Sequence, residues 1–371
     1  MTKQILITGG AGFIGSHLAD ALLARGHRVR ILDSLLEQVH GASAKVPAYL
    51  NKNVELLIGD VRDRASVDKA LTGIDVVYHL AAMVGVGQSM YAVSEYVNCN
   101  DLGTAVLLQA LIEKPIERLI VASSMSVYGE GTYQTLDGRV SGRTHRSLEQ
   151  LKAGDWNVRD SLGQVLIPAP TSETTSPDLN SVYALSKYSQ ERMCMMVGLA
   201  HGIPTVALRF FNVFGTRQAL SNPYTGVIAI FASHLLNEKR PVIFEDGQQL
   251  RDFVSVHDVV HACCLALETP GAPGQVFNVG SGRPYSILEM ANSLATALGM
   301  KGLTPEILGR YRAGDIRHCY ADISRARNIL GYEPRMSIEQ GMPEIAEWIR
   351  GELAAGRVPQ PRTDVKNALL I

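Results

Sequence analysis

A tyrosine and a lysine four residues apart are the first residues of this sequence that suggest a catalytic site. Tyr183 and Lys187 lie in a stretch with helical periodicity, so their side chains share one helical face, one turn apart. A free tyrosine has a pKa of about 10, so a nearby cation must stabilise the phenolate before it can act as a base at neutral pH. The pair predicts a proton-abstracting tyrosine, although this spacing alone is a weak pattern because it arises by accident in many helices.

Hydroxyl side chains at the end of an apolar strand supply a third group. Ser123, Ser124 and Ser126 follow the run Leu119 to Ala122, and a doubly wound sheet binds its ligand at the carboxyl ends of such strands. Ser124 can hydrogen-bond the oxygen whose proton Tyr183 removes, while a hydride leaves the same carbon for a nicotinamide. Together with Lys187, these residues predict an oxidoreductive site.

A glycine-rich turn near the N-terminus predicts where the nicotinamide cofactor binds. The residues Gly9, Gly12, Phe13, Ile14 and Gly15 follow an apolar strand and open a helix, which is the context in which such glycines bind a dinucleotide. Glycines permit a tight turn and a close approach of backbone to the pyrophosphate, which lies against the free N–H groups of the helix. These five residues are the predicted pyrophosphate contacts.

Asp33 favours NAD over NADP. It ends the second predicted strand, where its carboxylate can accept hydrogen bonds from the adenosine ribose and would repel a 2′-phosphate. No arginine follows it in residues 34–37, and Arg30 should point to the opposite face of the strand. Asp60, after the third strand, can contact the adenine edge or be a solvated turn residue, and the sequence leaves both open.

The elements that must position these groups predict an α/β fold. Short β-branched runs alternate with helical periodicity, as in parallel strands joined by crossover helices. We expect a Rossmann-type doubly wound parallel sheet with a smaller mixed α/β substrate-binding domain. Strands are expected at 4–8, 28–32, 54–58, 76–79, 119–122 and 205–209, and helices near 14–25, 65–71, 94–112, 147–152, 181–200 and 338–352.

The domain organisation follows from where this alternation stops. Residues rich in Gly, Ser, Thr and Pro interrupt it, and later elements are shorter and mixed. The expected division is an NAD-binding domain at 1–210 with an insertion at about 131–177 and completion by about 242–270, a substrate domain at 211–241 and 271–355, and a surface tail at 356–371.

Composition excludes several classes of partner. The 371 residues are 46% hydrophobic and 19% charged, as in ordinary globular proteins, and the net charge of -1 gives no support for a nucleic-acid partner. The five cysteines form no C-x-x-C pair, and their odd number argues against a disulfide framework. We see no signal peptide and no apolar run near the ~18 residues that span a bilayer. We therefore expect a cytoplasmic protein with no membrane partner.

These motifs resemble those of the extended short-chain dehydrogenases/reductases, in particular the NAD-dependent nucleotide-sugar epimerases similar to galactose 4-epimerase. The resemblance covers nearly the whole chain and includes His79-Leu-Ala-Ala82, Asn100-Asp-Leu-Gly-Thr104, Leu208 to Gly215, Gly247 to Val254 and Arg312-Ala-Gly-Asp315. It implies that NAD is also held by Asp60, Val61, Leu80, Ala81, Ala82, Asn100 and Ser123, besides Tyr183 and Lys187. It implies that a nucleotide-diphosphate sugar is held by Ser124, Ser126, Asn212, Arg251, Arg312 and Asp315, with guanidinium groups on the diphosphate.

The residues after the fifth strand reduce the number of reactions that this chain could catalyse. Relatives that are 4,6-dehydratases carry Thr-Asp-Glu there, and decarboxylating relatives place a glutamate where Ser126 stands. This chain reads Ser124-Met125-Ser126, which favours a 4-epimerase that inverts C4 through a transient 4-keto intermediate. The segment 83–91 and the insertion are similar to those of dTDP-L-rhamnose 4-epimerases, which make dTDP-6-deoxy-L-talose. The side chains of Met83, Val84 and Val86 suit a sugar methyl group or ordinary loop packing.

Other functions remain open. They are a UDP-sugar 4-epimerase acting on UDP-glucose, UDP-N-acetylglucosamine or UDP-glucuronate, then a nucleotide-sugar 4-ketoreductase, then a non-catalytic dinucleotide sensor. Asp33 argues against an NADPH-consuming reductase, and the intact Ser124, Tyr183 and Lys187 argue against a sensor. The resemblance suggests a homodimer through helices 94–112 and 181–200. The thiolates of a zinc knuckle are missing after Trp156, so no metal is expected.

Overall fold

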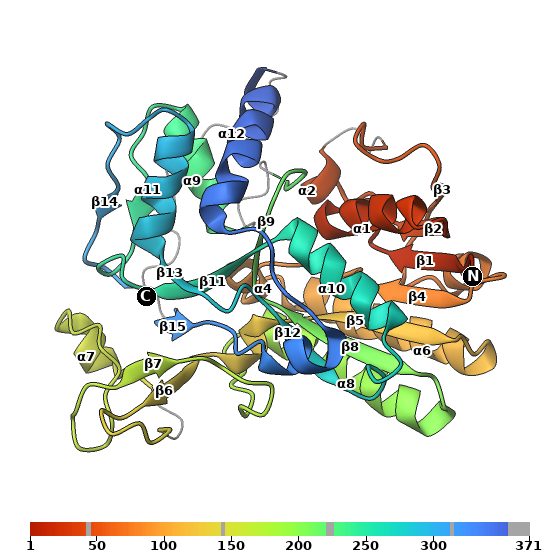
Figure 1. Ribbon diagram of the computed structural model, residues 1–371, viewed down its shortest axis with the longest axis horizontal. Coiled ribbons are helices and arrows are strands. Elements are labelled where there is room, and N and C mark those ends of the chain that lie inside the picture. The colour runs from red at the N-terminus through yellow and green to blue at the C-terminus, as the bar shows by residue number, and fades with distance from the viewer. Residues whose placement is uncertain (42–45, 142–144, 220–225, 312–314, 355–371) are drawn as a thin grey trace.

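The centre of the molecule is a seven-stranded parallel sheet (Figure 1). The computed structural model describes residues 1–41, 46–141, 145–219, 226–311 and 315–354. The strands are β1 (Gln4–Thr8), β2 (Arg28–Asp33), β3 (Glu55–Ile58), β4 (Val76–His79), β5 (Arg118–Ser124), β8 (Thr205–Phe210) and β12 (Val276–Val279), in the spatial order β12-β8-β5-β4-β1-β2-β3. The chain runs outward from β1 in one direction and then from β4 in the other, which confirms the doubly wound sheet and makes the carboxyl ends of β1 and β4 the switch point.

Helices cover both faces of this sheet (Figure 1). One face carries α1 (Phe13–Ala24) and α10 (Val256–Glu268), and the other carries α3 (Arg64–Ala70), α6 (Gly103–Glu113) and α8 (Val182–His201). Alternate residues of β1 serve the two faces: Ile5 and Ile7 join the core beneath α1, whereas Leu6 joins the opposite core. Burial on both faces explains why the strands are continuous apolar runs in the sequence.

The helix expected at 94–112 is divided into three parts. The segments α5 (Val93–Tyr96) and α6 flank a π-helical turn, η1 (Val97–Leu102), and Asn100 of that turn is fully buried. The two short helices α2 (Glu37–His40) and α4 (Val86–Ser89) were not expected. Helix α8 starts where Ser181 accepts a hydrogen bond from the N–H of Ala184 and ends at the left-handed Gly202, in agreement with the expected bounds.

A second core lies among three helices away from the large sheet. These helices are α9 (Val227–Leu236), α11 (Ile287–Ala297) and α12 (Ile338–Ala354). Beside them, β11 (Leu250–Ser255) pairs with β9 (Asn212–Phe214), β13 (Pro284–Ser286) and β15 (His318–Cys319). The 3-10 turn η2 (Met125–Tyr128) and the π-helical turn η3 (Ala326–Leu330) instead pack into the core beneath α1.

Two strands lie in the opposite domain from the one expected. Strand β10 (Val242–Ile243), expected to return to the NAD-binding domain, pairs with β14 (Glu306–Ile307), and Ile243 packs into the second core. Strand β12, within the expected substrate domain, is an edge strand of the large sheet beside β8. Short strands such as these take their position from a distant partner, which local periodicity does not identify.

The insertion forms a small unit of its own (Figure 1, lower left). Strands β6 (Thr132–Gln134) and β7 (Ile167–Ala169) pair antiparallel, and α7 (Leu148–Lys152) is capped by Ser147. The side chains of Tyr133, Val158 and Leu166 make its core. Such a small core needs further attachment, and buried ion pairs of Arg146 with Glu245 and Glu130 provide it.

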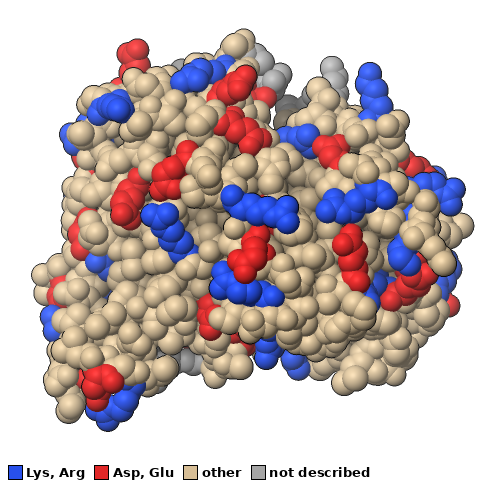
Figure 2. Space-filling view, viewed as in Figure 1, with Lys and Arg blue, Asp and Glu red and all other residues tan. Residues whose placement is uncertain are grey.

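Membrane-spanning helices, disulfide bonds and surface charge can be examined in the described residues. In the part of the chain that the structure describes, none of the helices could cross a lipid bilayer. All five cysteines are free thiols. Figure 2 shows basic and acidic side chains interspersed over one face of the molecule. The tail predicted at 356–371 lies outside the described residues.

Candidate active site

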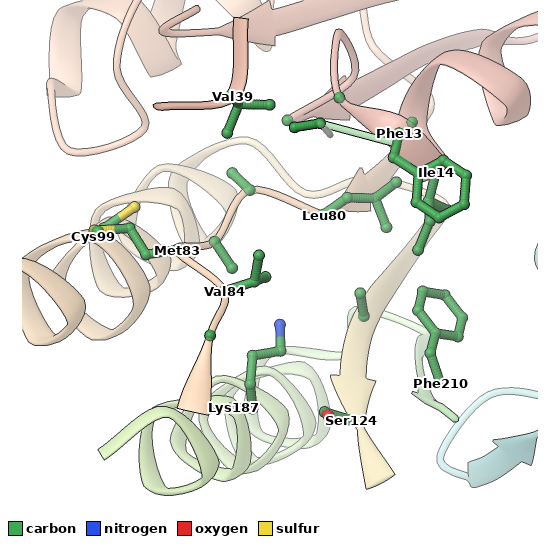
Figure 3. Close-up of a pocket in the computed structure, with 18 of the residues that line it drawn as sticks. Phe13, Ile14, Val39, Leu80, Met83, Val84, Cys99, Ser124, Lys187 and Phe210 are labelled. Atoms are coloured by element: carbon green, nitrogen blue, oxygen red, sulfur yellow. The ribbon is translucent and has the colours of Figure 1, made fainter. Parts of the chain in front are cut away.

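A cavity of about 740 Å³ opens at the carboxyl ends of β1, β4 and β5 and reaches the second domain. It therefore lies at the switch point of the sheet, where ligands bind in open α/β folds. Figure 3 shows its centre, with Lys187 and Ser124 on one side and Phe13, Ile14 and Leu80 on the other. The predicted residues that line it are Gly9, Gly12, Phe13, Ile14, Gly15, Asp33, Asp60, Val61, Leu80, Ala81, Ala82, Ser123, Ser124, Ser126, Tyr183, Lys187 and Asn212.

The glycine turn has a shape that only glycine permits. Gly9 has a φ of 70°, and a Cβ there would lie 2.8 Å from the backbone of Ala81. A Cβ on Gly15 would lie 2.6 Å from the Cα of Gly10 and from the carbonyl oxygen of Gly9. Gly12 caps α1 without any side-chain acceptor, so the first N–H groups of that helix stay available to an anion. The turn therefore fits the pyrophosphate of a dinucleotide.

Asp33 is held rigidly beside this turn. Its carboxylate accepts hydrogen bonds from the N–H groups of Ala11 and Leu35, both at 2.9 Å. Arg30 points away, as expected, and donates to the carbonyls of Ala70 and Thr72. The carboxylate that the sequence predicts to bind the ribose thus also ties together the two loops that form the cavity wall.

The adenine end of the cavity contains residues that the sequence did not single out. Asp60 lines the cavity, but its carboxylate accepts hydrogen bonds from Arg62 at 2.9 and 2.6 Å, which hold the pKa of Asp60 below its usual value. Gln38 and His40 of α2 also line it. The sequence did not announce them, because they lie on a four-residue helix that is too short to show a periodic pattern.

The hydroxyl groups after β5 are arranged to act on Tyr183. Ser124 Oγ accepts hydrogen bonds from the N–H of Ser126 at 3.2 Å and from its hydroxyl at 2.9 Å. A hydroxyl has one proton, so that of Ser124 remains for its hydrogen bond with Tyr183. Burial raises the pKa of Tyr183, and the hydrogen bond with Ser124 opposes this rise. Ser126 therefore orients Ser124, in addition to lining the cavity.

Lys187 lies one turn along α8 and points into the same space (Figure 3). Its ammonium donates a hydrogen bond of 2.8 Å to Oε1 of Gln190. Burial lowers the pKa of Lys187 to about 8. The sequence predicts a cation beside the phenol but not the glutamine that holds this cation.

Four predicted residues lie away from the cavity or outside the described part of the chain. Asn100 bonds the backbone of Met83 and the hydroxyl of Ser186, so it supports the cavity wall from behind. The guanidinium of Arg251 donates to the carbonyls of Leu250, Ile316 and Arg317, which keeps it from a diphosphate in this conformation. Asp315 accepts a hydrogen bond from Arg146 through its carbonyl, and Arg312 is not among the described residues.

Towards the second domain the cavity adds residues from distant parts of the chain, and we call this part the sugar end. They are Phe210, Phe211, Gln218, Val227, Ile228 and Phe253. The motif at 208–215 contains Phe210 and Phe211, and the motif at 247–254 contains Phe253, whereas no local pattern announced Gln218, Val227 and Ile228. Met83, Val84 and Val86 also line the cavity, and Figure 3 shows Met83 on the side of Cys99.

Known proteins with similar sequences and structures carry out related reactions. The family described as NAD dependent epimerase/dehydratase matches residues 5–147 and 162–280, and its gap falls in the insertion. The chain is 38% identical to the dTDP-L-rhamnose 4-epimerase of Burkholderia thailandensis over 95% of this chain and 96% of that protein. It is 32% identical to the UDP-N-acetyl-alpha-D-glucosaminuronate decarboxylase of Bacillus cytotoxicus, over 94% and 98%.

A solved structure with bound cofactor has the same fold. UDP-glucuronic acid 4-epimerase from Bacillus cereus, in complex with UDP-glucuronic acid and NAD, aligns with a TM-score of 0.77 and 30% identity, covering 94% of this chain and 99% of that one. The glycine turn, Asp33 and the Ser124, Tyr183 and Lys187 set lie in one cavity here. The chain is therefore an NAD-dependent enzyme that belongs to the NAD dependent epimerase/dehydratase family.

Proposed function

We propose that this enzyme is a nucleotide-sugar 4-epimerase whose substrate is dTDP-L-rhamnose and whose product is dTDP-6-deoxy-L-talose. The observation that carries the reaction type is that Ser124, Tyr183 and Lys187 line one cavity, with the hydroxyl of Ser124 opposing the rise in the pKa of Tyr183. Around them, the described lining residues Met125, Ser126 and Phe210 carry no carboxylate that could serve the additional acid–base step of a dehydratase.

The chemistry divides between the cofactor and the protein. The glycine turn and Asp33 would hold NAD, which when bound would supply the acceptor for the hydride of C4 and the source of the hydride that returns to the other face of that carbon. Tyr183 removes the proton of the C4 hydroxyl, and Ser124 donates a hydrogen bond to the oxygen that loses it. Inversion requires the 4-keto sugar to turn over while its diphosphate stays anchored, so the sugar pocket must be roomy and the anchor firm. The cavity volume of about 740 Å³ supports such a turn.

The sugar identity rests on two observations. The curated relative that matches at 38% identity is a dTDP-L-rhamnose 4-epimerase. Met83 and Val84 also add apolar side chains to the wall of the cavity that Lys187 lines, as the methyl group of a 6-deoxy sugar would favour (Figure 3). A UDP-sugar 4-epimerase is the second candidate, because Asn212 and Gln218 would suit a more hydroxylated sugar.

The test is incubation of the purified enzyme with dTDP-L-rhamnose, UDP-glucose, UDP-N-acetylglucosamine or UDP-glucuronate, followed by NMR of the C4 epimers. We expect NAD to remain bound through purification and turnover to be fastest with dTDP-L-rhamnose. Deuterium at C4 should persist in the inverted product, since the same hydride leaves and returns. Loss of this deuterium to water, or turnover only with added NADPH, would refute the proposed reaction.

We further propose that two copies associate through α8 and the segment of α5, η1 and α6. Leu185, Met196 and Leu199 of α8 are 53%, 53% and 88% exposed, and lie at spacings that place them near one helical face. Val97 and Leu102 of the neighbouring segment are also exposed. Light scattering of Leu185→Asp with Met196→Asp should report a monomer, whereas an unchanged dimer would contradict this interface.

A further inference from the structure

The ammonium group of Lys187 donates a hydrogen bond to an uncharged side chain, that of Gln190. Lys187 and Gln190 are 3% and 1% exposed, and the lysine Nζ donates to the glutamine Oε1 at 2.8 Å. Glu191, the nearest carboxylate along α8, is bound by Arg209 at 2.7 and 2.8 Å and by the hydroxyl of Ser123 at 2.6 Å. The buried lysine of this site therefore has an amide oxygen as its hydrogen-bond acceptor.

Hydrogen-bond counting determines which way that amide faces. The hydroxyl of Thr104 donates to the carbonyl of Asn100 and lies 2.8 Å from Nε2 of Gln190 and 2.9 Å from Nε2 of His79. A hydroxyl has one proton and two lone pairs, so Thr104 must accept from both nitrogens. Nε2 of Gln190 therefore faces Thr104 and the carbonyl of Ala81, at 3.4 Å, and Oε1 must face Lys187. Nε2 of Gln190 also lies 3.3 Å from Nε2 of His79, but both nitrogens carry protons here, so this approach is a contact and not a hydrogen bond.

The histidine in this network is a neutral, fixed support. His79 is 1% exposed, and burial lowers its pKa to about 3. Since its Nε2 carries the proton donated to Thr104, its Nδ1 accepts from the hydroxyl of Thr8 at 2.8 Å. Thr8 ends β1 and His79 ends β4, so the orientation of Gln190 is anchored on the two strands at the switch point of the sheet.

We propose that Gln190 is a positioning residue for Lys187: its amide oxygen, oriented by Thr104 and Ala81, holds the ammonium at the cavity wall without neutralising it, so that the positive charge acts on the phenol of Tyr183. This inference rests on the proposed role of Tyr183 as the base, but it does not depend on which sugar is bound. Figure 3 shows the ammonium of Lys187 pointing into the cavity.

Electrostatics explains why an amide serves here better than a carboxylate or an apolar group. A carboxylate at this distance would cancel much of the field that Lys187 exerts on Tyr183, because opposite charges in contact interact strongly in a buried site. An apolar group would remove the acceptor and lower the pKa of Lys187 further below about 8. The other titratable groups that act on Lys187 are Glu191, Cys194 and Cys99, and Glu191 is already neutralised by Arg209.

Two substitutions of Gln190 test its positioning role, and we expect them to shift the pH profile of kcat in opposite directions. In Gln190→Glu, the pKa of Tyr183 should rise, so the acidic limb of kcat should move to higher pH, by about one pH unit. In Gln190→Met, the basic limb should move to lower pH, because Lys187 loses its proton more readily. Gln275→Glu, which makes the same charge change in a loop before β12, should leave both limbs unchanged. KM for the sugar should stay within about twofold throughout.

A second readout follows Tyr183 without requiring turnover. The ultraviolet difference spectrum between each NAD-loaded variant and its Tyr183→Phe double variant reports ionisation of this tyrosine alone. Gln190→Glu could shift the titration of Tyr183 while the unchanged enzyme converts none of the sugars. That outcome would uphold the inference and refute the proposed reaction. An unshifted titration in a folded variant would overturn the inference even if epimerisation continues.

Thr104 provides an independent pair of variants should Gln190→Glu fail to fold. Thr104→Val keeps the shape but removes the hydroxyl that orients the amide, and we expect kcat to fall about tenfold with the basic limb shifted as in Gln190→Met. Thr104→Ser keeps the hydroxyl and should retain the pH profile of the unchanged enzyme. Identical pH profiles for the valine and serine variants would overturn the inference.

Discussion

The two ends of the cavity satisfy their polar groups in different ways. At the cofactor end, the carboxylate of Asp33 is bonded by Ala11 and Leu35, and the glycine turn is held by close backbone packing against Ala81. At the sugar end, the amide oxygen of Asn212 is buried and has no hydrogen-bond partner among the described residues. Burying such a group without a partner costs free energy, so a ligand group is expected to complete it.

Three arginines of the second domain and the insertion are engaged by protein groups. Arg251, expected at the diphosphate, donates to three carbonyls, and Arg146 and Arg317 both bind Glu245 in a buried cluster. These guanidinium groups hold loops of the second domain and the insertion. By comparison, among the described residues, the cofactor end leaves free the N–H groups of α1 that an anion can bind, whereas the sugar end leaves a buried side-chain oxygen for its ligand to complete.

The largest expected effect separates chemistry from cofactor binding. Tyr183→Phe removes the hydroxyl that takes the proton, so kcat should fall about a thousandfold while the cofactor end stays intact. NMR of the sugar products measures turnover, and the absorbance of nucleotide released on denaturation measures bound NAD. Unchanged turnover would refute Tyr183 as the base, and loss of NAD would show that the two ends are not separable.

Breaking the arginine cluster should weaken the attachment of the insertion. Arg146 is 4% exposed at its side chain and bonds Glu245 at 2.7 Å, so Arg146→Met leaves buried polar groups unpaired and should cost about 3 kcal/mol of unfolding free energy. Arg139→Met, in the same insertion but with its side chain 81% exposed, should cost less than about 1 kcal/mol. Denaturant unfolding compares them, and equal stabilities would contradict the structural role of the cluster.

Removing the charge of Asp33 should affect the cofactor end alone. Asp33→Asn weakens the hydrogen bonds from Ala11 and Leu35 and ends the repulsion of a 2′-phosphate, so NAD should bind about 10- to 100-fold more weakly and NADP should compete better. Calorimetry with both dinucleotides on cofactor-stripped protein measures this. Asp137→Asn on the exposed insertion is the control, and an Asp33→Asn variant with unaltered preference would be evidence against the ribose contact.

The smallest expected effect tests the sugar end, where the buried oxygen of Asn212 has no hydrogen-bond partner among the described residues. Asn212→Ala removes the unpartnered amide, so KM for the sugar should rise about tenfold with kcat nearly unchanged and NAD retained. Initial rates across sugar concentrations measure the two constants, with Asn53→Ala at an exposed turn as the control. A fall in kcat with KM unchanged would place Asn212 in the chemical step instead of in binding.

Contiguous motifs made the cofactor end predictable. The glycine turn and Asp33 lie on two consecutive strand-to-helix connections, and Tyr183 and Lys187 share one helix, so local spacing determined their relative positions. The doubly wound parallel sheet followed from the alternation of strands and helices, whereas the order of its strands came from the structure. By contrast, β10 and β12 exchanged domains relative to the expectation, because each has only a few residues and depends on a distant partner.

The sequence by itself determined the fold class, the dinucleotide turn and the serine, tyrosine and lysine of the site, since each depends on residues close along the chain. Only the tertiary structure decided that Arg251 faces carbonyls, that Asn212 has a buried oxygen without a partner, and that Gln190 holds Lys187. These contacts join segments that are far apart in sequence or depend on hydrogen bonds across the sheet. Their geometry is determined by packing and by the need to satisfy every buried polar group, which no local pattern records.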